Sequence, residues 1–142
     1  MGGAARAKQG PYSMSNVALT GCRVLVVEDE VLIGMVLEDI LDMLGCTLAG
    51  SAATMDEAWR LVDEGAFDLA ILDVNIGADP VFPVADAVRA RGVPVVFATG
   101  ALPDHLPPRF ADCAVLEKPY VYAGVEAALG RAWASRETAA ND

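Results

Sequence analysis

Five residues that could take part in chemistry lie where short apolar segments of the chain end. Glu28 and Asp29 close the first segment, and Asp73 closes the third. Thr99 ends the fourth segment, and Lys118 follows the fifth. If these segments are parallel strands of an open sheet, right-handed crossovers bring strands one, three, four and five together, and ligands bind beyond their carboxyl ends. We therefore expect three carboxylates, a hydroxyl and an ammonium group in one cleft.

The chemistry of this set favours a phosphoryl group and a divalent cation. Carboxylates at close range raise one another's pKa, and a hard cation relieves their repulsion. Mg²⁺ binds one or two carboxylates, several waters and phosphate oxygens. An ammonium and a hydroxyl are poor ligands for Mg²⁺ but bind phosphate oxygens, and a carboxylate can act as a nucleophile.

Asp73 is the most informative of the five residues, because it interrupts the apolar stretch "AILDVNIG" at 70–77. Burying a lone carboxylate costs on the order of several kcal/mol. A strand-end position at the mouth of a cation site explains the acid. The alternatives for Asp73 are a helix cap or a structural ion pair. The alternative for Glu28 and Asp29 is capping of the first helix.

Apolar segments alternate with helical patterns along the chain. Continuous apolar runs are typical of strands buried on both faces, and the alternation predicts an α/β fold with a doubly wound, five-stranded parallel sheet. Strands are predicted at 23–28, 46–52, 67–73, 93–99 and 112–117, and helices at 29–45, 54–65, 81–92 and 121–136.

Two segments near the predicted site are expected to be loops. One is "NIGADP" at 75–80. The other is 100–111, a position where the alternation of strands and helices would otherwise place a helix. Pro103, Pro107 and Pro108 remove backbone donors and favour extended conformations. We expect 100–111 to be a loop or at most a single turn, and to be more mobile than the other crossovers.

Composition narrows the class of protein. The 142 residues suit one domain, and the 54% hydrophobic content indicates a folded chain. The net charge of −10 argues against general binding to nucleic acid or anionic membranes. No apolar run reaches the roughly 18 residues of a transmembrane helix, and the N-terminus does not resemble a signal peptide. We therefore expect a cytoplasmic protein.

Cysteine and histidine give no sign of a second site. Cys22, Cys46 and Cys113 are an odd number and lack CxxC spacing, which favours reduced structural thiols over a disulfide or a zinc site. His105 stands among prolines and is interpreted as a solvated loop residue.

Four motifs, in this order and spacing, resemble the receiver domain of two-component response regulators. They are "VLVVEDE", "AILDVNI", "FATG" and "VLEKPY", and the resemblance covers about residues 22–136. It implies a flavodoxin-like sheet with strand order 2-1-3-4-5 and a degenerate fourth helix. It also implies that a histidine kinase or a histidine phosphotransfer protein phosphorylates Asp73.

The resemblance assigns further roles by position. Asp29, Asp73 and the backbone carbonyl of Asn75 would hold Mg²⁺, with Glu28 acting through water.

The phosphoryl group itself would be bound by other residues. Thr99 would reorient toward it, with Gly100 beside it adding backbone freedom. Lys118 would bind a phosphate oxygen, and the Lys118–Pro119 bond is predicted to be cis.

The sequence departs from the family pattern in two places. Val115 stands where the family commonly has a switch aromatic, so what replaces that ring is open. The segment "PVVFATG" resembles an alphaproteobacterial, often stand-alone subgroup with a PFxFATGY-like motif, but Val95 replaces its first Phe and Ala101 its Tyr.

We interpret the chain as a single-domain response regulator rather than an enzyme. It would switch the binding of an unidentified downstream protein, or act as a relay or phosphate sink, as a monomer or weak dimer. One alternative is a pseudo-receiver that binds partners without phosphorylation. An aspartyl-phosphate phosphatase of the haloacid dehalogenase type is disfavoured, because its second Asp is replaced by Asn75.

The domain is expected to span 21–137, with a flexible tail at 1–20 and a short tail at 138–142. Met14 could be the original first residue, and the sequence leaves open whether residues 1–13 are native. From the last helix, Val121, Val125 and Leu129 are predicted to face inward.

Overall fold

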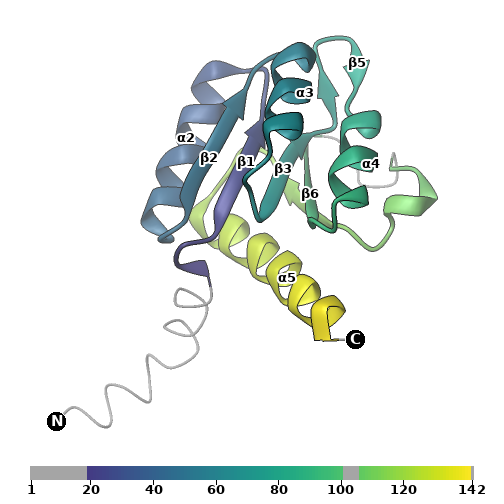
Figure 1. The fold of residues 1–142 in the computed structure, drawn as a ribbon. Coiled ribbons are helices and arrows are strands. Elements are labelled where there is room, and N and C mark those ends of the chain that lie inside the picture. The colour runs from purple at the N-terminus through teal and green to yellow at the C-terminus, as the bar shows by residue number, and fades with distance from the viewer. Residues whose placement is uncertain (1–18, 101–105, 142) are drawn as a thin grey trace, which may run out of the picture.

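The computed structural model describes residues 19–100 and 106–141, with side chains as far as residue 135 (Figure 1). The expected tail at 1–20 therefore lies outside the described residues except for Leu19 and Thr20. Leu19 is fully buried in the core. Residues 101–105 of the predicted loop, which include His105, also lie outside the described residues.

A five-stranded parallel sheet forms the centre of the domain, as predicted. Its order is β2-β1-β3-β6-β7, which is 2-1-3-4-5 when its strands are numbered along the chain. The three central strands are almost wholly buried because helices cover both faces. The strands are β1 (Arg23–Val27), β2 (Thr47–Ala52), β3 (Leu69–Asp73), β6 (Val95–Thr99) and β7 (Ala114–Glu117).

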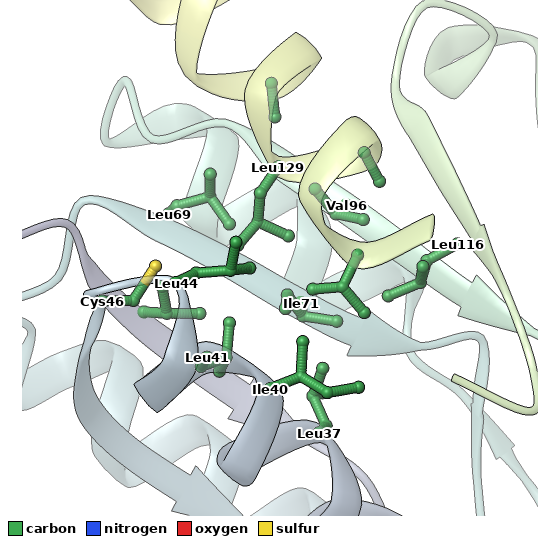
Figure 2. Packing of buried hydrophobic residues seen from close by; sticks show 14 of the residues in the cluster. Leu37, Ile40, Leu41, Leu44, Cys46, Leu69, Ile71, Val96, Leu116 and Leu129 are labelled. Carbon is green, nitrogen blue, oxygen red and sulfur yellow. The ribbon is translucent and has the colours of Figure 1, made fainter. Parts of the chain in front are cut away.

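Two helices pack on each face of the sheet. Helices α2 (Val31–Met43) and α5 (Tyr122–Asn141) cover one face, and α3 (Met55–Glu64) and α4 (Phe82–Ala90) cover the other (Figure 1). Figure 2 shows the first face, where leucines of α2 and α5 meet across the apolar side chains of β3. Alternate residues of each central strand thus feed two separate cores.

Local signals explain where the helices begin. The Thr54 hydroxyl accepts a hydrogen bond from the Glu57 amide at 3.1 Å, and the Glu57 carboxylate accepts one from the Ala53 amide at 2.8 Å. This reciprocal capping box starts α3. Pro83 lies in the first turn of α4, where a missing N–H costs nothing.

The structure corrects three details of the prediction. Helix α2 begins at Val31, because Glu30 is extended and occupies the N-cap position. Helix α5 extends to Asn141, beyond the predicted end at 136. Val121 precedes that helix and is exposed, whereas Val125 and Leu129 face inward as expected.

The segment 75–80 is not the irregular loop that was predicted. It forms a short antiparallel hairpin of β4 (Asn75–Ile76) and β5 (Asp79–Pro80). Gly77, with φ of 63°, adopts the left-handed conformation that the tight turn requires.

Between β6 and β7, the described residues contain a single turn of 3₁₀ helix, η2 (Pro108–Phe110). The prediction of at most one turn holds over 106–111. Within the described ranges, no helix has both the length and the apolar character needed to cross a membrane.

Candidate functional site

The three acids of the predicted site come together at the carboxyl end of the sheet. Val27 of β1 pairs with Leu72 of β3, so the residues that follow them are neighbours. Carboxylate oxygens of Glu28, Asp29 and Asp73 all lie within 4.8 Å of one another. Glu28 is 5% exposed and Asp73 is 8% exposed, so two of these acids are buried.

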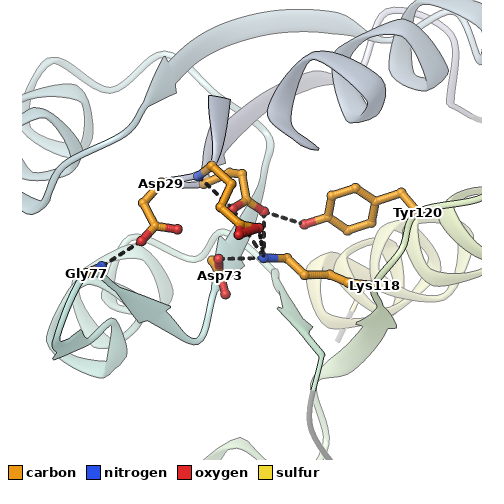
Figure 3. Close-up of polar contacts among 7 residues, drawn as sticks. Asp29, Asp73, Gly77, Lys118 and Tyr120 are labelled. Carbon is orange, nitrogen blue, oxygen red and sulfur yellow. Dashed lines mark hydrogen bonds and ion pairs between the residues drawn. The ribbon is translucent and has the colours of Figure 1, made fainter. Parts of the chain in front are cut away.

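Lys118 lies between the two buried acids. Its Nζ is 2.8 Å from Asp73 Oδ2 and 3.0 Å from Glu28 Oε1, and the dashed lines in Figure 3 converge on this ammonium group. The Lys118 amide also donates to the Thr99 carbonyl at 3.0 Å, which fixes the end of β7 beside the end of β6. The structure thus brings together the lysine and the acids that the sequence placed in one cleft.

The electrostatics of the cluster follow from this burial. Burial raises the pKa of Asp73 to about 6, with the hydrogen bond from Lys118 opposing the shift and the Glu28 charge adding to it. Burial lowers the pKa of Lys118, but its bonds to Asp73 and Glu28 outweigh burial and leave that pKa raised. The Lys118 ammonium therefore stays charged at neutral pH, whereas Asp73 begins to take up a proton as the pH falls toward 6.

Tyr120 belongs to the site, although the sequence gave it no role beyond packing or a partner surface. Its ring is buried, and its hydroxyl donates to Glu28 Oε1 at 3.0 Å (Figure 3). Burial, followed by the Glu28 charge, raises the pKa of Tyr120. The usable signal was its position two residues after the predicted site lysine, across the Lys118–Pro119 bond, which is cis as predicted.

Asp29 does not cap the first helix. Its Oδ2 accepts a hydrogen bond from the Gly77 amide at 2.8 Å, so it fastens the turn of the β4–β5 hairpin. The N-cap residue of α2 is Glu30, which makes no side-chain cap bond. The Glu30 amide instead donates to Glu28 Oε2 at 3.1 Å.

The remaining predicted residues lie at the same rim. Thr99 ends β6 and is buried, and Gly100 follows it in an exposed position. Asn75 is exposed at the start of β4. The structure places these residues at the same carboxyl rim as the acids, and their roles stay predictions.

Aromatic rings pack behind Thr99, on the face of the sheet covered by α3 and α4. Phe97, two residues before Thr99, lies 5.0 Å from Phe110 of η2 and 6.0 Å from Phe82 of α4, measured between ring centroids. Phe97 and Phe110 are fully buried. Val115, the position of the missing switch aromatic, pairs with Phe97 on the neighbouring strand.

Arginines fasten η2 to α4 at the surface. Arg109 contacts both carboxylate oxygens of Asp86, at 2.9 and 3.0 Å. Arg89 donates to the Arg109 carbonyl at 2.8 Å, and both guanidinium groups lie over the Phe110 ring. The segment that replaces a fourth helix is thus anchored at its far end.

A doubly wound sheet with clustered acids and a partly buried lysine at its carboxyl rim is the architecture of signalling receiver domains. Residues 24–112 match the family described as the response regulator receiver domain, and the chain belongs to this family. The predicted resemblance is confirmed.

Known proteins similar to the chain agree with this assignment. It is 32% identical over 114 residues to the phyllosphere-induced regulator PhyR of Methylorubrum extorquens, covering 77% of this chain and 42% of PhyR. The chain therefore spans less than half the length of that relative.

Two solved structures are more similar in sequence. The solution structure of SdrG from Sphingomonas melonis Fr1 is 47% identical with a TM-score of 0.70, over 80% of this chain and 96% of that one. The BeF3-activated conformation of SdrG from Pseudomonas melonis Fr1 is 46% identical with a TM-score of 0.68, over 77% and 93% of the respective chains.

Proposed function

We propose that this receiver accepts a phosphoryl group from a phosphohistidine on the carboxylate of Asp73. The donor would be a sensor histidine kinase or a histidine phosphotransfer protein in the cytoplasm. The observation that carries the proposal is the buried Asp73 carboxylate, bonded to Lys118 and within 4.8 Å of two further acids. A simple structural ion pair between Asp73 and Lys118 would leave the two further acids beside Asp73 unexplained.

The donor set suits Mg²⁺. Asp29 uses Oδ2 for the Gly77 amide, which leaves its other oxygen for a cation. Both oxygens of Glu28 are engaged by Lys118, Tyr120 and the Glu30 amide, so Glu28 fits an indirect role through water. When bound, Mg²⁺ would supply positive charge to the phosphoryl oxygens.

The transfer uses groups of this chain in stated roles. Lys118 donates to Asp73 Oδ2, which leaves Oδ1 as the nucleophile. Oδ1 forms a bond to phosphorus while the bond from phosphorus to the donor imidazole nitrogen breaks, and the imidazole leaves. Lys118 then pairs with a phosphoryl oxygen, because the acyl phosphate takes the place of its carboxylate partner.

Beryllofluoride is a mimic of a phosphoryl group, so the BeF3-activated structure of a 46% identical chain supports this reading. It favours phosphorylation over the pseudo-receiver alternative. Val115 and the short η2 segment are the features that keep that alternative under test.

Apolar side chains beside the site offer a surface for the donor protein. Leu32, Met35 and Val36 are exposed along α2, directly after the acids, and Leu32 is 77% exposed. Val121 is exposed directly after the Lys118 loop. A donor that reaches Asp73 from this side would cover both groups.

Intact mass after incubation with acetyl phosphate and Mg²⁺ tests the proposal. The wild-type protein is expected to gain one phosphoryl group, and Asp73→Asn none. Asp63→Asn makes the same change on the exposed surface of α3 and should gain the group as wild type does. Phosphorylation of Asp73→Asn would remove the assignment, and failure of all three proteins would favour the pseudo-receiver.

A further inference from the structure

Two cysteines lie side by side at the amino ends of neighbouring strands, far from the candidate site. Cys22 directly precedes β1, and Cys46 directly precedes β2. The next residues, Arg23 and Thr47, are register partners, and the Thr47 amide donates to the Cys22 carbonyl at 2.8 Å. Parallel neighbours lie about 4.8 Å apart, within the roughly 4.4–6.8 Å between Cα atoms that a disulfide accepts.

The two thiols also point to the same place. Both belong to the apolar core between the sheet and helices α2 and α5, and Cys46 lies among its leucines in Figure 2. The Cys22 thiol hydrogen bonds to Cys46, which lowers the pKa of Cys46 although burial opposes the shift. All three cysteines of the chain are present as thiols.

Both thiols are buried, and Cys46 is the less deeply buried of the two. Cys46 follows the turn at Gly45 and is 8% exposed, whereas Cys22 is 1% exposed. The thiolate is the reactive form of cysteine. The more accessible thiol is thus also the one whose thiolate is stabilised by a donor.

We propose that Cys22 and Cys46 are a redox-modification site, a dithiol that hydrogen peroxide converts to a disulfide. The Cys46 thiolate attacks one peroxide oxygen, the O–O bond breaks, and hydroxide leaves to become water. The resulting Cys46 sulfenic acid is attacked by the Cys22 sulfur, which forms the S–S bond and releases a second water. Two thiols are oxidised and one peroxide is reduced to two waters.

Cys113 is the built-in control. It packs against the core on the opposite face of the sheet, with its Sγ 3.7 Å from Arg89 Nη1. Burial raises the pKa of the Cys113 thiol. The sheet therefore separates Cys113 from the pair. Its raised pKa keeps Cys113 as the thiol, which is less reactive than the thiolate.

The disulfide would close a loop that holds β1, α2 and the acids Glu28 and Asp29. It lies at the other end of these strands from the acids, so it would tie edge strand β2 to β1 without touching the site. Cross-linking restricts the unfolded chain. The oxidised protein should therefore unfold at a higher temperature than the reduced protein.

The test treats the full chain with hydrogen peroxide, removes the oxidant, and alkylates the unfolded protein before intact-mass analysis. The expected result is one alkylated thiol in place of three and a loss of two hydrogen atoms. Trypsin cuts after Arg23, so the disulfide must join peptide 9–23 to peptide 24–60, while Cys113 lies in a third peptide.

Variants separate the two steps. Cys113→Ser should form the same cross-linked peptides at the wild-type rate. Cys22→Ser should leave Cys46 as a sulfenic acid that dimedone labels, whereas Cys46→Ser should not label Cys22. Three alkylated thiols in oxidised wild type, or a link through Cys113, would overturn the proposal. Neither result depends on phosphorylation of Asp73.

Discussion

Two groups of contacts at the carboxyl rim of the sheet, called here the charged side and the aromatic side, are held together by different forces. On the charged side, residues that end or follow β1, β3 and β7 form a chain of polar contacts in which Lys118 joins Asp73 to Glu28 and Tyr120 joins Glu28 to the core. On the aromatic side, around β6 and η2, three phenylalanines pack against one another behind Thr99.

The two groups differ in the kind of energy that holds them: electrostatic interactions in the acid and lysine cluster, and apolar packing in the phenylalanine cluster. The charged side has three acids and one lysine, so its energy depends on their protonation states and would change with a bound cation or phosphoryl group. The aromatic side is built on contacts among three phenylalanine rings, so its contribution depends mainly on buried apolar area. Under the proposed function, a phosphoryl group on Asp73 would act directly on the charged side and would reach the aromatic side through Thr99.

Phe110→Ala tests the aromatic side and has the largest expected effect on stability. Phe110 is fully buried between Phe97 and Phe82, so its loss removes apolar burial and leaves a cavity. The free energy of unfolding should fall by about 3–5 kcal/mol. Denaturant unfolding measures this change, and Trp59→Ala, which removes a ring from the surface of α3, should cost far less.

Mg²⁺ binding is the second measurement on Phe110→Ala. At a temperature where the variant is folded, its Mg²⁺ affinity should stay close to that of wild type, because Phe110 packs with Phe82 and Phe97 and is not a member of the acid cluster. A large loss of affinity would show that the two sides are not separate.

Sequence reasoning reached the fold and the charged side for the same physical reason. Parallel strands buried on both faces give continuous apolar runs, and an acid or a lysine that ends such a run must lie at the rim. Asp73 and Lys118 could be placed in this way before their 2.8 Å contact was known.

The contacts that sequence reasoning missed depend on registers that apolar periodicity does not encode. The hairpin at 75–80 has strands of two residues each, too short for a periodic pattern, and its turn rests on the conformation of Gly77. Asp29 was assigned a possible cap because its partner, the Gly77 amide, is 48 residues away. Tyr120 looks like a packing residue until Glu28 is placed beside it.

Lys118→Met tests the charged side and should have the second largest effect. The change keeps most of the apolar stem and leaves Asp73 and Glu28 without their shared cation. Removing one partner of a buried ion pair costs at least about 3 kcal/mol. Because Lys118 is only partly buried, we expect the free energy of unfolding to fall by about that amount. Thermal unfolding in EDTA should show this loss.

Mg²⁺ should return part of the stability lost in Lys118→Met, because it brings positive charge back to the same acids. The gain in unfolding temperature on adding Mg²⁺ should exceed that of wild type. Arg60→Met, which removes one positive charge from the exposed surface of α3, should behave as wild type in both buffers. An equal gain in all three proteins would mean that Mg²⁺ does not compensate for the charge of Lys118 at these acids.

Tyr120→Phe sharpens the description of the charged side with a smaller change. It keeps the buried ring and removes the hydroxyl that donates to Glu28 Oε1. A hydrogen bond to a charged group contributes about 1.5 kcal/mol, so the loss in unfolding free energy should be near that value. Tyr122→Phe, at an exposed ring of α5, should cost almost nothing. A neutral Tyr120→Phe would mean that Lys118 and the Glu30 amide hold Glu28 without the phenol.

The smallest expected effect belongs to the surface pair of Arg109 and Asp86, which ties η2 to α4. The hydrogen bond from Arg109 lowers the pKa of Asp86 below its ordinary value. A carboxyl whose folded pKa is lowered contributes stability above its unfolded pKa of about 3.9, and this contribution is lost as the pH falls through the folded pKa. Both side chains are about half exposed, so salt should weaken the pair. In Arg109→Gln, an NMR titration of the Asp86 carboxyl should therefore show a higher pKa than in wild type, while Arg60→Gln should leave it unchanged. Equal Asp86 pKa values in Arg109→Gln and wild type would show that the pair does not persist in solution, and the Phe110 packing and the Arg89 contact with the Arg109 carbonyl would then hold η2 in place.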